Sequence, residues 1–127
     1  MINTIHLWLI AIGGMLGSVM RYVVSVFINT KTASVSAIPW GTFGVNIIGS
    51  LIIGLVFGYS MRNAGFEQNW RVFLTIGVCG GFTTFSALSN ESFLLLKEQQ
   101  YAPLMFYIAA SLVFGIAETA FGYWLAK

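Results

Sequence analysis

The chain contains no aspartate, one cysteine and one histidine among its 127 residues. The single Cys79 excludes an intramolecular disulfide and a multi-cysteine metal site, and His6 alone excludes a cluster of histidine ligands. Only 8% of the residues are charged, whereas soluble domains carry about 25%. The net charge of +2 is too small for a nucleic-acid-binding surface. These absences argue against an ordinary soluble enzyme and against a nucleic-acid partner.

Long hydrophobic runs are what the sequence has in abundance, since 57% of the residues are hydrophobic. A membrane-spanning helix needs about 20 mostly apolar residues, and four stretches meet this requirement. They cover 5–28, 40–61, 72–90 with an extension to 96, and 102–126. The first stretch lacks the basic start and the cleavage site of a signal peptide. The sequence predicts an all-α membrane protein with four transmembrane helices in a single integral membrane domain, residues 1–127.

The basic residues divide evenly between the two sides of this predicted topology. One side carries Arg62, Arg71 and Lys127, and the other carries Lys31, Lys97 and Arg21. Orientation in the membrane follows an excess of Lys and Arg on the cytoplasmic side, and here there is no excess. The count leaves two alternatives open: one orientation set by context, or dual topology with subunits that pair antiparallel. Four short helices enclose little interior, so we expect an oligomer.

The third stretch contains a run of glycines and hydroxyl residues, Gly-Gly-Phe-Thr-Thr-Phe-Ser, at 80–86. Adjacent glycines support a continuous helix poorly. A break frees backbone carbonyls, and inside a membrane these need partners within the protein or at a cation. The sequence therefore predicts a break near 80–84. The alternative is a packing surface whose Thr and Ser side chains bond back to the preceding turn.

Uncharged polar residues also occur inside the second and fourth stretches. Asn46 either bonds a neighbouring helix or faces a pore or substrate, because an unpaired amide in hydrocarbon is costly. Tyr107, Ser111, Gly115 and Thr119 recur every four residues and so share one helix face. This stripe either joins helices or forms an ion-conducting track. Hydroxyl donors without basic residues suit a small anion.

Three charged residues lie inside or beside the predicted spans, where charge indicates a functional candidate. Arg21 in the first stretch most simply extends its side chain toward the membrane surface. Glu91 directly follows the third stretch and can face a vestibule. For Glu118 we favour an approach to the membrane interface near Lys127, and the alternative is a carboxylate that handles protons or cations.

The order of these motifs resembles the Fluc (CrcB) family of fluoride channels over nearly the whole chain. The segments that carry the resemblance are 13–22, 39–49 and 80–86. The last of them, close to the family's Gly-Gly-x-Thr-Thr-Phe-Ser pattern, is the most specific. The resemblance implies a fluoride-selective channel, not an enzyme. It would export fluoride passively across the bacterial cytoplasmic (inner) membrane without a nucleotide and so lower fluoride toxicity.

The resemblance also implies an assembly and a set of site residues. The assembly is an antiparallel, dual-topology homodimer in the lipid bilayer, with two fluoride pores and a central structural Na⁺ held by backbone carbonyls that match Gly80 and Thr83. Pore positions match Asn46, Phe85, Tyr107, Ser111 and Thr119, with Thr42 and Ser86 as neighbouring polar positions. Arg21 and Glu91 match supporting positions near the vestibule.

Three residues depart from the family pattern. Leu88 stands where the family has a second phenylalanine, Gly115 stands where it often has serine, and Glu118 has no counterpart. Two other functions therefore stay open. One is a small proton-coupled exporter of cationic drugs, which would use a membrane carboxylate such as Glu118. The other is a partner subunit that does not itself transport.

Overall fold

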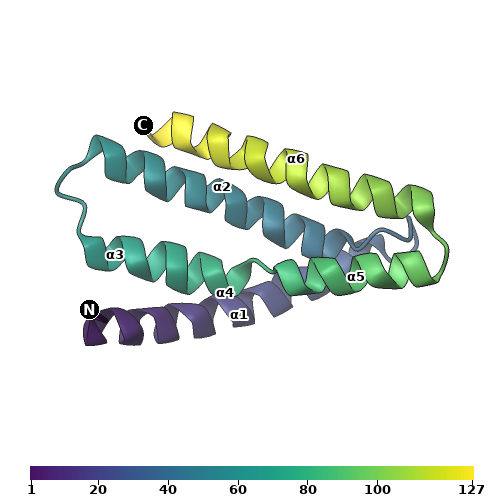
Figure 1. Ribbon diagram of the computed structural model, residues 1–127, viewed down its shortest axis with the longest axis horizontal. Helices are drawn as coiled ribbons and strands as arrows, with labels where there is room; N and C mark the ends of the chain where they lie inside the picture. The colour runs from purple at the N-terminus through teal and green to yellow at the C-terminus, as the bar shows by residue number, and fades with distance from the viewer.

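The computed structural model describes all 127 residues, and its regular structure is entirely helical (Figure 1). Its elements are α1 (Thr4–Thr32), α2 (Trp40–Arg62), α3 (Gln68–Val72), the π-helix η1 (Phe73–Cys79), α4 (Gly80–Phe82), α5 (Phe85–Lys97) and α6 (Tyr101–Ala126). Elements α3 to α5 follow one another as one long stretch. Four helical stretches are long and apolar enough to cross a membrane, which confirms the predicted all-helical class and the number of spans.

Local hydrogen bonds explain where the first two helices begin. The Asn3 side chain accepts a hydrogen bond from the Ile5 N–H at 2.9 Å and so caps α1. Pro39 precedes α2, where its missing N–H costs nothing because the first turn of a helix has no donor partners. The Gly41 N–H in that first turn donates to Asn29 Oδ1 of α1 at 2.8 Å. The start of α2 is thereby tied to the end of α1.

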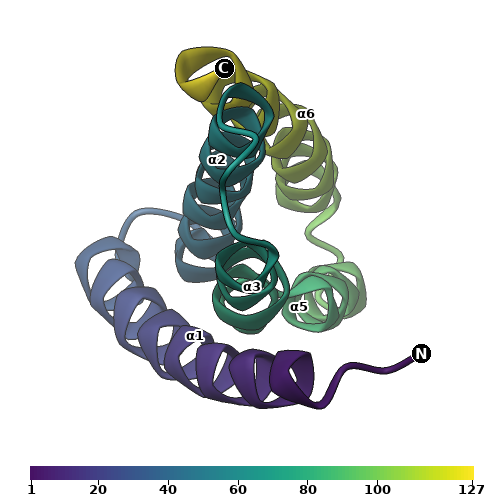
Figure 2. The same ribbon diagram turned by 90° about the vertical axis from the view of Figure 1, so that its left-hand side faces the viewer.

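Helix α2 lies between α6 and α1 (Figure 2). Helix α6 packs along one side of α2, and α1 lies across the opposite side against η1 and α4. Both termini lie at the same end of the molecule (Figure 1), as an even number of spans requires. Close approach depends on glycine: a Cβ at Gly13 would lie 2.9 Å from the Cα of Gly77 in η1. Small residues at such crossings permit tight packing in lipid.

The third membrane stretch is broken at Thr83 and Thr84, which have extended backbone with ψ of 156° and 118°. The break lies within the predicted region, but its position differs from a simple glycine break because Gly80 and Gly81 are both helical. The winding also changes before the break, since Phe73–Cys79 forms a π-helix. Such wide turns are rare and concentrate at functional sites.

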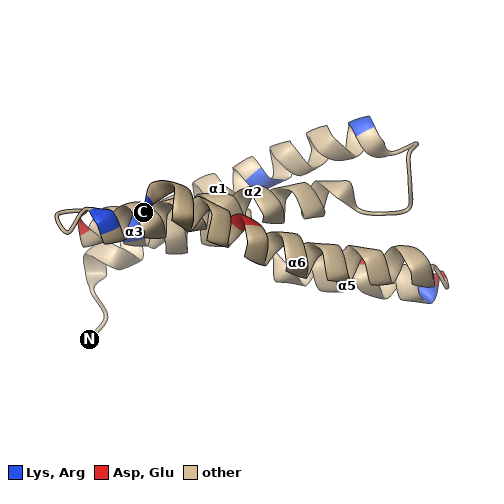
Figure 3. Ribbon diagram, turned by 90° about the horizontal axis from the view of Figure 1, so that it is seen from above, with Lys and Arg blue, Asp and Glu red and all other residues tan.

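Only 16 of the 127 residues are buried, and many large hydrophobic side chains are exposed along the helices. Charged residues gather at the ends of the helices, and few lie along their length (Figure 3). A surface of this kind suits lipid around most of the chain.

Candidate functional site

Asn46 holds the broken segment in place. Its Oδ1 accepts a hydrogen bond from the Thr84 N–H at 2.8 Å, and its Nδ2 donates to the Thr84 carbonyl at 3.1 Å. The amide of α2 therefore satisfies both backbone groups of one extended residue. The side chain of Thr84 in turn accepts from the Ala87 N–H at 3.2 Å and caps α5. The break is thus a built feature in which Asn46 replaces the missing helical partners.

The same break leaves the carbonyls of residues 80–83 without their helical donors, which would be the N–H groups of residues 84–87. The Thr84 N–H, which would bond the Gly80 carbonyl in a continuous helix, is engaged by Asn46. The Ala87 N–H, which would bond the Thr83 carbonyl, is engaged by the Thr84 hydroxyl. The Thr83 hydroxyl bonds back to the Cys79 carbonyl at 2.9 Å, as the alternative sequence interpretation expected for threonine here. Gly80 and Thr83 are the two residues that the resemblance proposed as carbonyl ligands.

Glu91 joins three helices through its two carboxylate oxygens. Thr42 of α2 donates to Oε1 at 2.7 Å, and Tyr107 of α6 donates to Oε2 at 2.6 Å. Thr42 is 5% exposed and Tyr107 is fully buried. Hydrogen bonds to a charged group are shorter and stronger than neutral ones. This cluster fixes the carboxylate between α2, α5 and α6.

A polar cavity of about 600 Å³ lies beside the Glu91 cluster. Of the predicted site residues, Arg21, Thr42, Ser86 and Glu91 line it together. Arg21 forms no ion pair with Glu91, so the two charges share the cavity without contact. Three residues of α1 that also line this cavity, Ser18, Tyr22 and Ser25, are not among the predicted site residues. Their spacing with Arg21 on one helix face was a usable signal.

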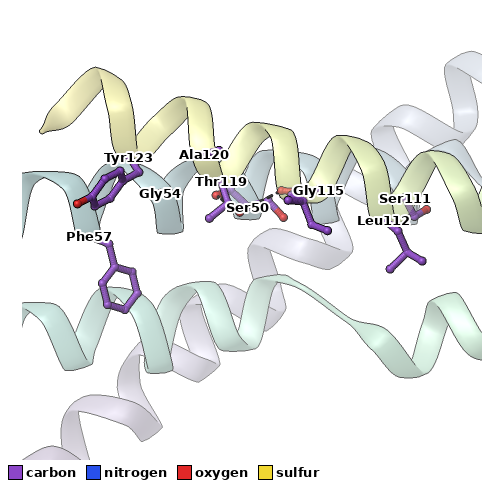
Figure 4. A pocket seen from close by; sticks show the side chains of 10 residues that line it. Ser50, Gly54, Phe57, Ser111, Leu112, Gly115, Thr119, Ala120 and Tyr123 are labelled. Atoms are coloured by element: carbon purple, nitrogen blue, oxygen red, sulfur yellow. Dashed lines mark hydrogen bonds between the residues drawn. The ribbon is translucent and has the colours of Figure 1, made fainter.

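A second cavity, of about 680 Å³, lies between α2 and α6 (Figure 4). Ser111, Gly115 and Thr119 of the predicted stripe line it. The Ser111 hydroxyl is buried and has no hydrogen-bond partner, whereas the Thr119 hydroxyl donates to the Ser50 carbonyl at 3.2 Å and to the Gly115 carbonyl at 3.0 Å. The stripe is therefore divided, because Tyr107 belongs to the Glu91 cluster instead.

Phe85 projects away from the protein directly after the break and is 79% exposed. It lines a third cavity, of about 250 Å³, together with Asn46, Thr83 and Leu88. The neighbouring Phe82 lies in the core with 3% exposure. Of the two rings around the break, Phe85 alone is free to contact an ion or a partner.

Tyr107→Phe is expected to lower the free energy of unfolding by about 1–3 kcal/mol, because the substitution leaves a part-buried Glu91 oxygen without its donor. Unfolding of the purified protein by denaturing detergent measures this change. Tyr101→Phe is the matched control, since Tyr101 lies on the same helix, is 58% exposed and makes no side-chain hydrogen bond. Equal stability of both variants would show that the Glu91 cluster contributes nothing to folding.

Comparison with known proteins identifies close relatives along nearly the entire chain. The fluoride-specific ion channel FluC of Bacteroides fragilis is 46% identical over 120 residues, which cover 93% of each chain. FluC of Phocaeicola vulgatus is 43% identical over 121 residues, covering 95% of this chain and 98% of the relative. FluC of Leptospira interrogans is 40% identical over 121 residues, covering 95% and 94%. The family model described as CrcB-like protein, Camphor Resistance (CrcB), matches residues 8–123. The chain therefore belongs to the CrcB-like family.

Proposed function

We propose that this protein is a fluoride-specific ion channel that releases fluoride passively through the cytoplasmic membrane. The observation that carries the proposal is the 46% identity over 93% of the chain to a relative named as a fluoride-specific ion channel. The chemistry of the site supports it, since hydroxyls and one amide gather beside the helix break and along α6. A small anion that loses its water needs such donors at close range.

The ion path that we propose runs past the break and along α6. Phe85 offers an aromatic ring whose edge carries partial positive charge, and it lies beside Asn46 in the third cavity. In the cavity between α2 and α6, Ser111 offers a free hydroxyl, and Thr119 offers one that must leave its carbonyl partners to bind the ion. Thr42, Ser86 and Tyr107 complete the set of polar residues. Arg21 and Glu91 set the charge of the neighbouring vestibule.

An antiparallel homodimer is the assembly that we propose for this channel. The exposed Phe85 ring lies at the surface of one subunit's broken helix, and Thr83 lines the cavity beside it. Backbone polar groups at membrane depth are stable only where protein or water covers them. A second copy covers this region, and the even division of basic residues permits the opposite insertion that an antiparallel pair requires.

The chain's own residues fit a structural Na⁺ at the break, as we infer from the carbonyls there that lack helical donors. A hard cation takes oxygen ligands, and Gly80 and Thr83 would supply carbonyl oxygens. Bound there, the ion would neutralise the carbonyl dipoles and hold the break in one conformation. Asn46 fixes the same segment independently, because it bonds both backbone groups of Thr84.

A flux measurement on the purified protein tests the function. Liposomes that contain only this protein and potassium fluoride are expected to release fluoride when a potassium ionophore balances the charge, as a fluoride electrode records. Liposomes loaded with chloride are expected to release far less anion. The donors of the site are placed to replace the water around a small anion such as fluoride, and chloride is larger. Release no faster than from protein-free vesicles, or equal release of both anions, would contradict the proposal. The oligomeric state is measured on the same preparation.

A further inference from the structure

Ser50 occupies a position between two cavities that otherwise share no residue. It lines the cavity beside the break together with Asn46, Thr83 and Phe85. It also lines the cavity between α2 and α6, together with Ser111. Ser50 is thus the one side chain common to the region of the break and the hydroxyl stripe of α6.

The Ser50 hydroxyl also faces the gap in that stripe. A Cβ built on Gly115 has Ser50 Oγ as its nearest atom, at 3.6 Å. The hydroxyl stripe of α6 therefore lacks an oxygen of its own at the point where α2 presents one. Figure 4 shows Ser50 beside Gly115 and Thr119, with Ser111 farther along the same helix.

The hydroxyl of Ser50 is free to bind a ligand. The Ser50 carbonyl accepts from Thr119 at 3.2 Å, whereas the hydroxyl makes no hydrogen bond within the chain. The single hydrogen of the Thr119 hydroxyl, in contrast, is already shared between two carbonyls. Ser111 has a free hydroxyl as well. Ser50 and Ser111 are therefore the two serines in this cavity with an uncommitted donor.

We propose that Ser50 passes the anion between the cavity beside the break and the α6 track, and that its hydroxyl takes the place that a serine at position 115 would fill. The inference rests on the proposed channel function and deepens it, because it adds a donor from α2 to a track otherwise built from α6. A dehydrated anion between the two cavities accepts its hydrogen bond from Ser50, so the hydroxyl lowers the barrier at this point.

Fluoride release from liposomes tests the role of Ser50 with two variants: one that removes its hydroxyl and one that restores a hydroxyl from α6. Ser50→Ala is expected to slow release at least about tenfold, because one hydrogen bond to a charged group is lost. The double variant Ser50→Ala with Gly115→Ser is expected to regain most of the rate, since it returns a hydroxyl to the same gap from α6. The space suits this repair, because the added Cβ makes ordinary contact at 3.6 Å from Ser50 Oγ.

Ser60→Ala is the matched control, on the same helix but outside all three cavities, and it is expected to keep the unmodified rate. Its hydroxyl donates to the Phe57 carbonyl at 2.9 Å. Unchanged release by Ser50→Ala would overturn the inference. So would a loss that Gly115→Ser does not repair, because the defect would then lie in the packing of α2 on α6. If the unmodified protein releases no fluoride, the proposed function itself fails, which is a distinct result.

Discussion

Asn46→Ala is expected to destabilise the protein by about 2–6 kcal/mol, because the N–H and the carbonyl of Thr84 each lose a partner and each unpaired buried group costs about 1–3 kcal/mol. Both hydrogen bonds join α2 to the segment between α4 and α5. Their loss frees the break to shift, so fluoride release is expected to fall with stability. Unfolding by denaturing detergent and the liposome assay measure the two effects.

Asn63→Ala is the matched control for that substitution. Asn63 follows the same helix, and its exposed side chain donates to the Tyr59 carbonyl at 3.2 Å. Water can replace this bond, so the control is expected to keep normal stability. An unfolding midpoint of Asn46→Ala equal to that of Asn63→Ala would mean that the break is held by something other than the Asn46 amide.

Gly122→Ala is expected to lower the free energy of unfolding by about 3 kcal/mol, at the upper end of the usual cost of overpacking. Gly122 is buried where α6 crosses α2. An added Cβ would lie 2.9 Å from the Leu55 nitrogen and would also overlap the Leu51 carbonyl. Backbone atoms cannot move aside as a flexible side chain can, so the two helices must separate. Detergent-induced unfolding and the fraction of protein that stays dispersed after purification report the loss.

Gly14→Ala is the control for this second substitution, because a Cβ at Gly14 meets nothing within 4 Å. Alanine is the better helix former by about 1 kcal/mol, so this variant is expected to be as stable as the unmodified protein or slightly more stable. A similar loss in both variants would attribute the effect to glycine in general and not to the crossing of α2 and α6.

The helical class and the number of spans follow from local sequence properties, and the structure confirms both. Hydropathy over about 20 residues places four helical stretches within a few residues of their ends. The break could also be predicted, since two glycines and three hydroxyl residues lie in seven positions. The π-helix over Phe73–Cys79 could not, because no composition marks that segment.

The sequence predicted which residues belong to the candidate site, but it did not predict which of them contact one another. The sequence placed Tyr107 in one stripe with Ser111 and Thr119, but the structure pairs Tyr107 with Glu91. The expected approach of Glu118 to the membrane interface near Lys127 stays a prediction. Ser50 was not recognised, because nothing in its immediate sequence distinguishes it from a packing serine.

By itself, the sequence determined that this chain is an all-helical membrane protein with four spans, a break in the third and hydroxyl groups within the hydrocarbon. Each of these properties depends on residues that are neighbours in the chain. The tertiary structure alone decided which groups meet: Asn46 with Thr84, 38 residues apart, and Thr42 with Glu91, 49 residues apart. A hydrogen bond forms only at about 3 Å, and at these separations the packing of helices, not the order of residues, sets that distance.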